Sequence, residues 1–212
     1  MGSLYFFRSI KKILAIVALL LVPVGAQASS LAISGGTAIT FAGYNGQPAS
    51  VTGTYTSGHL GTLIALAGGT FSATYLGQES GYLNQFKFLE VGGLKLTELD
   101  ALGKTISMQV DAGVLGFKFW DSKGAVVKNG VDPTTDSSTK NDFASFAILA
   151  GQCNNYGCFD YILGFNDGYK FDADYDDFVV GVRLSPVPLP AAVWLFGSAL
   201  IGFMFVSNRR RV

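Results

Sequence analysis

The hexapeptide TFSATY, Thr70 to Tyr75, decides the fold class. It places Phe71, Ala73 and Tyr75 on one face of an extended chain and three hydroxyl-bearing side chains on the other. Strict alternation over a short segment indicates a half-buried β-strand. The same alternation recurs at residues 106–110, 115–119, 159–165 and 178–184, and residues 143–149 are expected to form a further strand.

Residues 29–185, called the body from here on, are long enough for one domain with its own core. No repeat of about 20–50 residues is visible, which argues against a solenoid or propeller. About eight to eleven short strands predict an all-β fold, a single antiparallel sandwich of jelly-roll-like form. Residues 90–102 are expected to form a strand plus a short helical turn, and His59 is expected in a surface loop.

The first 28 residues have the pattern of a secretory signal peptide. Arg8, Lys11 and Lys12 precede an apolar run at 13–22, and Ala26 and Ala28 supply the small residues that signal peptidase requires. We expect a signal helix that is cleaved after Ala28.

The last 27 residues, 186–212, have the pattern of a short membrane helix. Sixteen uncharged residues, 191–206, separate Pro188-Leu189-Pro190 from the basic triplet Arg209-Arg210-Arg211. At about 1.5 Å per residue this helix is slightly shorter than the roughly 30 Å hydrocarbon layer. Because arginine clusters favour the cytoplasmic side, the body is expected outside the inner membrane.

The tail resembles the PEP-CTERM sorting signal of exported bacterial proteins. The resemblance is carried by the proline pair, the apolar run with Trp194, and the terminal arginines, with Leu189 where the family usually has Glu. It implies recognition in the membrane by an exosortase-type enzyme, cleavage near the prolines, and transfer of the body to the cell surface or extracellular material.

The charge of the chain is unevenly distributed. Three of the fifteen Lys and Arg residues lie in the signal and three in the tail, so the body carries nine, against all fifteen Asp and Glu. An acidic body argues against nucleic acid as a partner. Cys153 and Cys158 are close in sequence, and in an oxidising compartment this spacing predicts a disulfide.

The densest polar cluster precedes the last strand. It contains five carboxylates, those of Asp167, Asp172, Asp174, Asp176 and Asp177. These groups repel one another unless a cation, hydrogen-bond donors or water separate them. An EF-hand is rejected because its glycine and its terminal glutamate are missing. Two interpretations remain, a different calcium-binding loop and a solvated acidic turn.

The acidic segment also resembles the D-x-D-[FY]-[ND]-D ending of an uncharacterised extracellular β-domain found before such sorting tails. Asn166 stands where that family tends to have Glu, and Asp176 where it has Asn. Residues 77–84 resemble an upstream part of the same domain, with Glu79 and Asn84 at its polar positions. The resemblance implies that these two residues come near the acidic loop.

Catalytic motifs are weak in this sequence. There is one histidine and no G-x-S-x-G elbow, and neighbouring aspartates on a turn are more often structural than a glycosidase pair. We therefore expect an exported, non-catalytic protein of the cell surface or of an exopolysaccharide matrix. The alternatives are a calcium-assisted carbohydrate-binding adhesin, which could use the loop tyrosines 44, 156, 169 and 175, and a secreted polysaccharide hydrolase.

Overall fold

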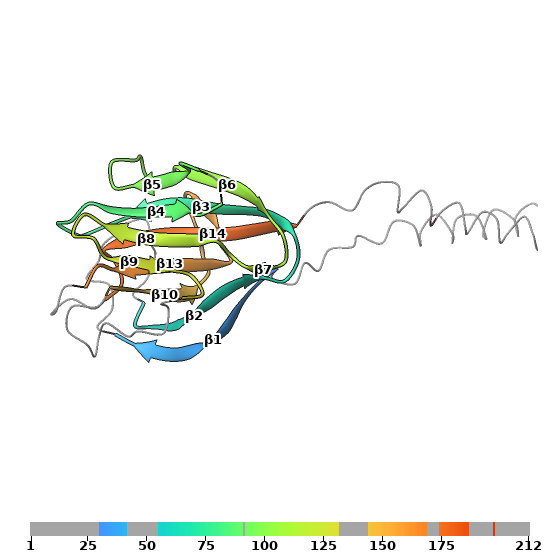
Figure 1. Cartoon of the computed structure of the whole chain (residues 1–212), viewed down its shortest axis with the longest axis horizontal. Helices are drawn as coiled ribbons and strands as arrows, with labels where there is room; N and C mark the ends of the chain where they lie inside the picture. Colours follow the sequence, from blue (N-terminus) through green and yellow to red (C-terminus); the bar gives the residue numbers. More distant parts are fainter. Residues whose placement is uncertain are drawn as a thin grey trace, which may run out of the picture.

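The alternating segments form antiparallel strands in two facing sheets (Figure 1). The computed structural model describes residues 30–41, 55–90, 92–131, 144–168, 174–186 and 197. Within these ranges no helix is long and apolar enough to cross a membrane. The expected signal helix, its cleavage residues Ala26 and Ala28, and the sorting tail with its proline and arginine motifs lie outside the described residues, apart from Gly197.

The larger sheet has the strand order β1-β2-β10-β13-β14-β3-β6, and β7 pairs with β2. Every pairing in it is antiparallel. Its strands are β1 (Leu31–Thr40), β2 (Ser57–Ala65), β3 (Gly69–Gly77), β6 (Thr105–Val110), β7 (Gly113–Val114), β10 (Ser145–Ala150), β13 (Tyr161–Asn166) and β14 (Phe178–Pro186).

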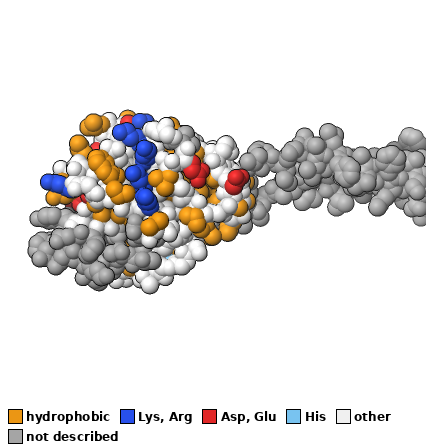
Figure 2. Space-filling view, viewed as in Figure 1, with side chains coloured by type: hydrophobic (Ala, Val, Ile, Leu, Met, Phe, Trp, Pro, Cys, Tyr) orange, Lys and Arg blue, Asp and Glu red, His pale blue; other side chains and the backbone are white. Residues whose placement is uncertain are grey.

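The smaller sheet has the order β5-β4-β8-β9 and lies against one face of the larger one. Its strands are β4 (Asn84–Phe88), β5 (Lys95–Thr97), β8 (Phe117–Asp121) and β9 (Val126–Lys128). A separate hairpin joins β11 (Cys153–Asn154) and β12 (Gly157–Cys158). The outer face of the molecule seen in Figure 2 carries a stripe of Lys and Arg side chains.

Phenylalanines fill the space between the two sheets. Phe119 stacks on Phe165 with ring centroids 5.0 Å apart, and Phe117 meets Phe146 at 5.6 Å. Both β4 and β8 alternate buried and half-buried residues, as expected for strands with one face in a core. By contrast, β10, β13 and β14 are buried on both faces, because an apolar cluster covers each face of the larger sheet at these strands.

The far face of the larger sheet has its own apolar cluster, which includes Leu60, Ile162 and Val179. The ring of Phe159 packs against this cluster and lies directly over β14. A Cβ at position 181 would come within 2.5 Å of that ring, so only glycine fits there. This contact explains why a glycine interrupts the run of valines at 179–182.

Two local expectations need correction. His59 does not lie in a surface loop: it is a half-buried residue of β2, paired with Ile148 of β10. Residues 92–102 contain β5 and hydrogen-bonded turns, with Asp100 accepting from the backbone N–H of Thr97 at 2.8 Å. The expected strand is therefore present as β5, and only the helical turn needs correction: a turn follows the strand, closed by the bond from the Asp100 backbone N–H to the Thr97 carbonyl oxygen at 3.0 Å and by the Asp100 side chain.

The chain enters and leaves the sandwich at one end. The Ser30 hydroxyl donates to the carbonyl oxygen of Leu184 at 2.9 Å, which ties the start of β1 to the end of β14. β14 begins at Phe178, at the opposite end of the sheet (Figure 1). The acidic residues that precede Phe178 are therefore at the end far from both connections.

Candidate metal centre

Four chain segments meet at the far end of the sandwich, and three of them carry carboxylates. The four are the segment after β3, the start of β4, the end of β13 and the residues before β14. These segments meet because β14 lies between β13 and β3 in the larger sheet, while β4 follows β3 into the smaller sheet. Glu79 comes from the first segment, and Asp174 and Asp176 come from the last.

Tyr175 fixes the position of the two aspartates that flank it. It is the one described non-glycine residue in the left-handed region, with φ 63°. Its ring is fully buried, contacts Phe41 at a centroid distance of 5.1 Å, and its hydroxyl accepts a hydrogen bond from Ser145 at 3.2 Å. A non-glycine residue in this conformation costs about 1–2 kcal/mol, which the buried ring offsets.

The core of the candidate site is formed by Glu79, Asp174 and Asp176. Each offers one carboxylate oxygen, and the three oxygens lie within 4.8 Å of one another. Asp174 is 2% exposed and Asp176 is 0% exposed, whereas Glu79 is exposed. Neither oxygen of Asp176 has a hydrogen-bond donor. A buried carboxylate in this condition needs a proton or a cation.

The surroundings of Asp176 disfavour its charge. Burial is the largest cause, the neighbouring Asp174 carboxyl is the next, and the charges of Glu79 and Asp177 add to them, so that the pKa of Asp176 is raised from 3.8 to about 9. In the absence of a cation, Asp176 therefore holds a proton at neutral pH. A bound cation would replace that proton.

Asp167 and Asp177 have a supporting role beside the cluster. The Asp177 carboxylate accepts the backbone N–H of Asp167 at 2.8 Å. The Asp167 carboxylate accepts the Ser80 hydroxyl at 2.6 Å and the Asn84 side-chain amide at 3.2 Å. The same amide group of Asn84 also reaches the carbonyl oxygen of Asp177 at 3.3 Å. These bonds tie the four segments together and occupy both carboxylates.

In the structure the expected site residues thus have two different roles. Asp174 and Asp176 join the cluster, whereas Asp167 and Asp177 are engaged with backbone and side-chain donors. Asp172 lies outside the described residues. Glu79 and Asn84 lie beside the acidic segment, as the resemblance implied.

Glu98 is a member of this end that the sequence did not indicate. Its carboxylate accepts the backbone N–H of Asn84 at 2.6 Å. Burial raises the pKa of Glu98, the Asn84 N–H lowers it, and the charge of Asp167 raises it again. This contact could not be predicted from the sequence, because Glu98 and Asn84 become neighbours only when β5 pairs with β4.

The donor set of the cluster suits a hard cation. Carboxylate oxygens are the ligands of Ca²⁺, which takes about six to eight oxygens in flexible geometry. The cluster, as far as the structure describes it, contains neither His nor Cys, the ligands that favour zinc or copper. Two further buried oxygens at this end lack donors, Oδ1 of Asn84 and Oε1 of Gln78.

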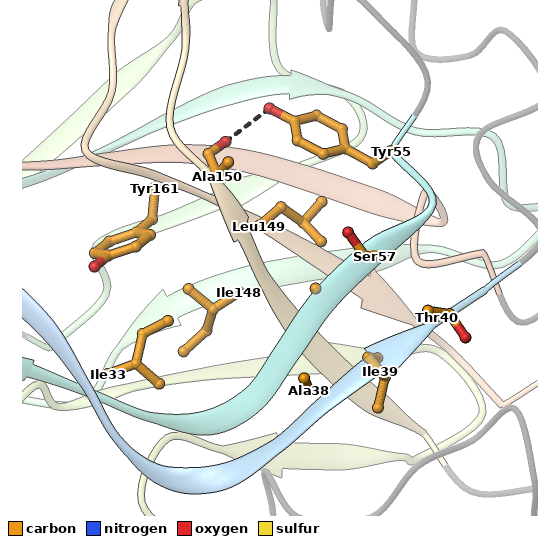
Figure 3. A pocket seen from close by; sticks show the side chains of 11 residues that line it. Ile33, Ala38, Ile39, Thr40, Tyr55, Ser57, Ile148, Leu149, Ala150 and Tyr161 are labelled. Atoms are coloured by element: carbon orange, nitrogen blue, oxygen red, sulfur yellow. Dashed lines mark hydrogen bonds between the residues drawn. The ribbon is translucent and has the colours of Figure 1, made fainter.

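A groove between β1, β2 and β10 is a second concave feature (Figure 3). Its volume is about 520 Å³, and Ile39, Ile148 and Leu149 are among its lining residues. The Tyr55 hydroxyl donates to the carbonyl oxygen of Ala150 at 2.7 Å, so this group is already engaged. The described lining residues include no carboxylate, histidine or cysteine, and the side-chain hydroxyl groups among them belong to Thr40, Tyr55, Ser57 and Tyr161.

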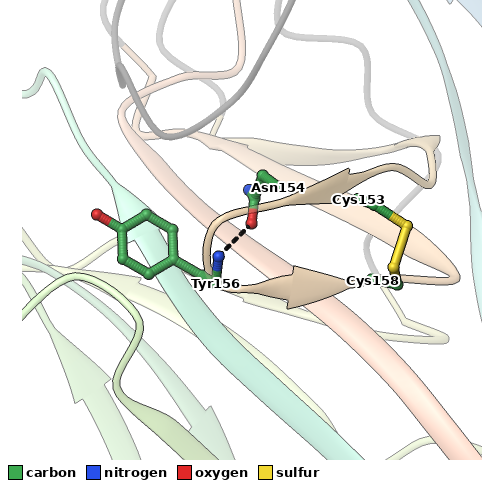
Figure 4. Close-up of a disulfide and its surroundings, with 4 residues drawn as sticks. All are labelled: Cys153, Asn154, Tyr156 and Cys158. Carbon is green, nitrogen blue, oxygen red and sulfur yellow. Dashed lines mark hydrogen bonds between the residues drawn. A yellow bond between two sulfur atoms is a disulfide. The ribbon is translucent and has the colours of Figure 1, made fainter.

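The two cysteines lie in the small hairpin β11–β12 (Figure 4). A disulfide joins Cys153 to Cys158, which are paired directly across the hairpin. The backbone N–H of Tyr156 donates to Oδ1 of Asn154 at 2.8 Å, which shapes the turn. Tyr156 is 38% exposed, but Tyr175 is fully buried and cannot stack on a sugar. Tyrosines 44 and 169 lie outside the described residues.

Comparison of the chain with family models, with curated proteins and with solved structures finds no match. The function must therefore be argued from the site.

Proposed function

We propose that this chain is an exported, non-catalytic protein of the cell surface or extracellular matrix, whose far end binds a calcium ion. The observation that carries the proposal is Asp176, which is fully buried, lacks a hydrogen-bond donor, and lies beside two further carboxylates. Glu79, Asp174 and Asp176 would hold the ion. Its role would be structural, because it would join the segment after β3 to the segment before β14.

The disulfide favours a location outside the cytoplasm, and the proposed calcium site would agree with it. Disulfides persist in oxidising compartments. Calcium sites of extracellular modules have dissociation constants of about 10⁻⁴ to 10⁻³ M, and such sites fill only outside the cell. We therefore propose that the jelly-roll-like sandwich is exported by a signal peptide cleaved by signal peptidase, and is held in the inner membrane by the helix 191–206.

The proposed fate of the body follows from the resemblance of the tail to PEP-CTERM signals. An exosortase-type enzyme would cut near Pro188-Leu189-Pro190 and release the body or attach it to surface material. Because the chain enters and leaves the sandwich at one end, the calcium site would point away from the membrane.

The second candidate is a calcium-assisted carbohydrate-binding adhesin. The observation that favours it is the exposure of Glu79, which leaves one side of the cluster open to solvent. A sugar hydroxyl could then bind the ion directly. This candidate requires calcium-dependent retention on a glycan array, and Glu79→Gln should abolish that retention.

Thermal unfolding with calcium or magnesium tests the ion. If the dissociation constant is about 10⁻⁴ M, 10 mM calcium should stabilise the folded protein by about 2.7 kcal/mol. For a domain of this size the melting temperature should rise by about 5–10 °C. Magnesium should have a smaller effect, and Glu79→Gln should reduce the calcium effect, while the exposed control Glu90→Gln should not. An equal response of all three proteins would refute the assignment.

Export is tested by alkaline phosphatase fused after Leu184. The enzyme should be active in this fusion and silent when residues 1–28 are deleted. A silent full-length fusion, with an active control carrying an established signal peptide, would contradict the proposed topology.

A further inference from the structure

Four lysines, one on each strand, form a row across the smaller sheet. In the strand register Lys95 of β5 lies opposite Lys87 of β4, Lys87 lies opposite Lys118 of β8, and Lys118 lies opposite Lys128 of β9. The stripe of basic side chains in Figure 2 crosses this sheet. We call these four residues the lysine row.

The lysine row lies on the outer face of the sheet. Side chains alternate along each strand, and the neighbours Phe86, Phe117 and Phe119 are fully buried against the larger sheet. Lys95 and Lys128 are exposed and the two central lysines are half-buried. No lysine of the row forms an ion pair with a described residue; the ion pair that the described part of the chain contains joins Lys104 to Asp100.

Such an arrangement works against the stability of the fold. Like charges placed directly opposite on neighbouring strands are destabilising, and the row contains three such pairs in succession. The body also has few positive charges, nine against fifteen acidic ones, and four of the nine are in this row. Because the inward phenylalanines set the register, the outer face would tolerate neutral or acidic residues instead. The row therefore favours an anionic partner, whose charge would offset this repulsion.

An aromatic side chain lies next to the row. Trp120 is two residues from Lys118 on the same strand and therefore on the same face. It is half-buried and lies opposite Gln85 on one side and Val126 on the other. The Lys95 ammonium group reaches the amide oxygen of Gln85 at 3.5 Å. The face thus combines a line of cations with an aromatic surface and an amide.

We infer that this face binds an acidic polysaccharide, a chain of carboxylate-bearing sugars lying across the strands. With strands about 4.8 Å apart, the row is about 14 Å long and one lysine wide, which suits a single polymer strand. Each sugar of such a polymer carries a carboxylate, those on the side facing the sheet can pair with lysines, and Trp120 can stack on the apolar face of a ring. A DNA duplex is disfavoured because its wider charged surface would also meet the acidic body. This inference uses none of the residues of the calcium site.

The test is binding of the purified exported protein to immobilised polygalacturonate, at fixed calcium and at two salt concentrations. Lys87→Gln with Lys118→Gln should weaken binding about tenfold, and added salt should weaken wild-type binding because the contacts are solvent-exposed. The control removes the same charge elsewhere, with Lys104→Gln and Lys123→Gln, and should bind like the wild type. Trp120→Ala should weaken binding and keep the salt dependence.

A stability measurement separates loss of binding from loss of folding. The Lys87→Gln and Lys118→Gln protein should melt at a temperature equal to or above that of the wild type, since it loses like-charge repulsion. Equal loss of binding in the charge-matched control would overturn the inference, as would equal binding of the neutral polymer dextran. Tighter binding of duplex DNA or polyphosphate would also overturn it. Asp176→Asn should keep polymer binding, so failure of the calcium proposal would be recognised separately.

Discussion

Asp176→Asn tests the electrostatics of the far end of the sandwich. Asp176 has a raised pKa in the folded protein, about 9 against 3.8. Between these two values the folded state holds a proton that the unfolded state has lost, so the free energy of unfolding of the cation-free protein falls as pH rises. Between pH 3.8 and pH 7 the free energy of unfolding falls by about 1.4 kcal/mol for each pH unit. Over about three pH units the loss is about 4 kcal/mol.

Asparagine resembles the protonated aspartate and does not titrate. In the presence of EDTA, Asp176→Asn should therefore match the wild type near pH 4 and exceed its free energy of unfolding by about 4 kcal/mol at pH 7. Urea unfolding at a series of pH values measures this difference, and Asp111→Asn, an exposed aspartate, serves as the control. Parallel pH dependences for wild type and Asp176→Asn would refute the reasoning. With calcium present the order should reverse, because only the wild type gains the ion.

Three further predictions concern stability, each read from the free energy of unfolding in urea. Replacing both Cys153 and Cys158 by serine should lower it by about 2 kcal/mol, and a reductant should then affect only the wild type; an effect of the reductant on both proteins would contradict this. Asn129→Ala should cost about 3 kcal/mol, because this buried side chain makes three hydrogen bonds to neighbouring backbone, and a loss below about 1 kcal/mol would show that water replaces them. Phe119→Ala should cost about 4 kcal/mol because its ring stacks on Phe165 between the sheets; a smaller loss than for the exposed-site control Leu99→Ala would be incompatible with the described core.

The strands could be predicted because alternation is a local property. Phe71, Ala73 and Tyr75 all face the core as their spacing indicates. The opposite face carries the three hydroxyl groups, as expected, but it is not uniformly exposed. Thr74 is buried, and its hydroxyl forms a 2.8 Å hydrogen bond with that of Thr105 on the neighbouring strand. Which strand pairs with which depends on contacts between distant residues, so the order of the sheets could not be read from the sequence.

His59 shows how a local signal can mislead. Glycines at 58 and 61 favour a loop, yet both lie in β2. A Cβ at Gly58 would come within 2.6 Å of a Leu149 methyl group, and one at Gly61 within 2.8 Å of an Ile33 methyl group. These glycines permit close packing of neighbouring strands, which a single sequence does not distinguish from the flexibility of a turn.

The site was predictable in composition but not in geometry. The sequence shows a group of aspartates, but their division into buried cluster members and hydrogen-bonded supports depends on the left-handed backbone and buried ring of Tyr175. The lysine row has no sequence signature at all. Its members become neighbours only through the register of β5, β4, β8 and β9.

Calorimetric titration of the purified exported protein with calcium tests the cation site most directly. Titrations at pH 7 in two buffers of different ionisation enthalpy also count the protons released. We expect about one ion per chain and the release of up to about one proton, the proton that Asp176 holds in the cation-free protein. Asp176→Asn should bind calcium far more weakly and release no proton. Absence of binding heat in both buffers, or calcium binding by Asp176→Asn that equals that of the wild type, would contradict the account.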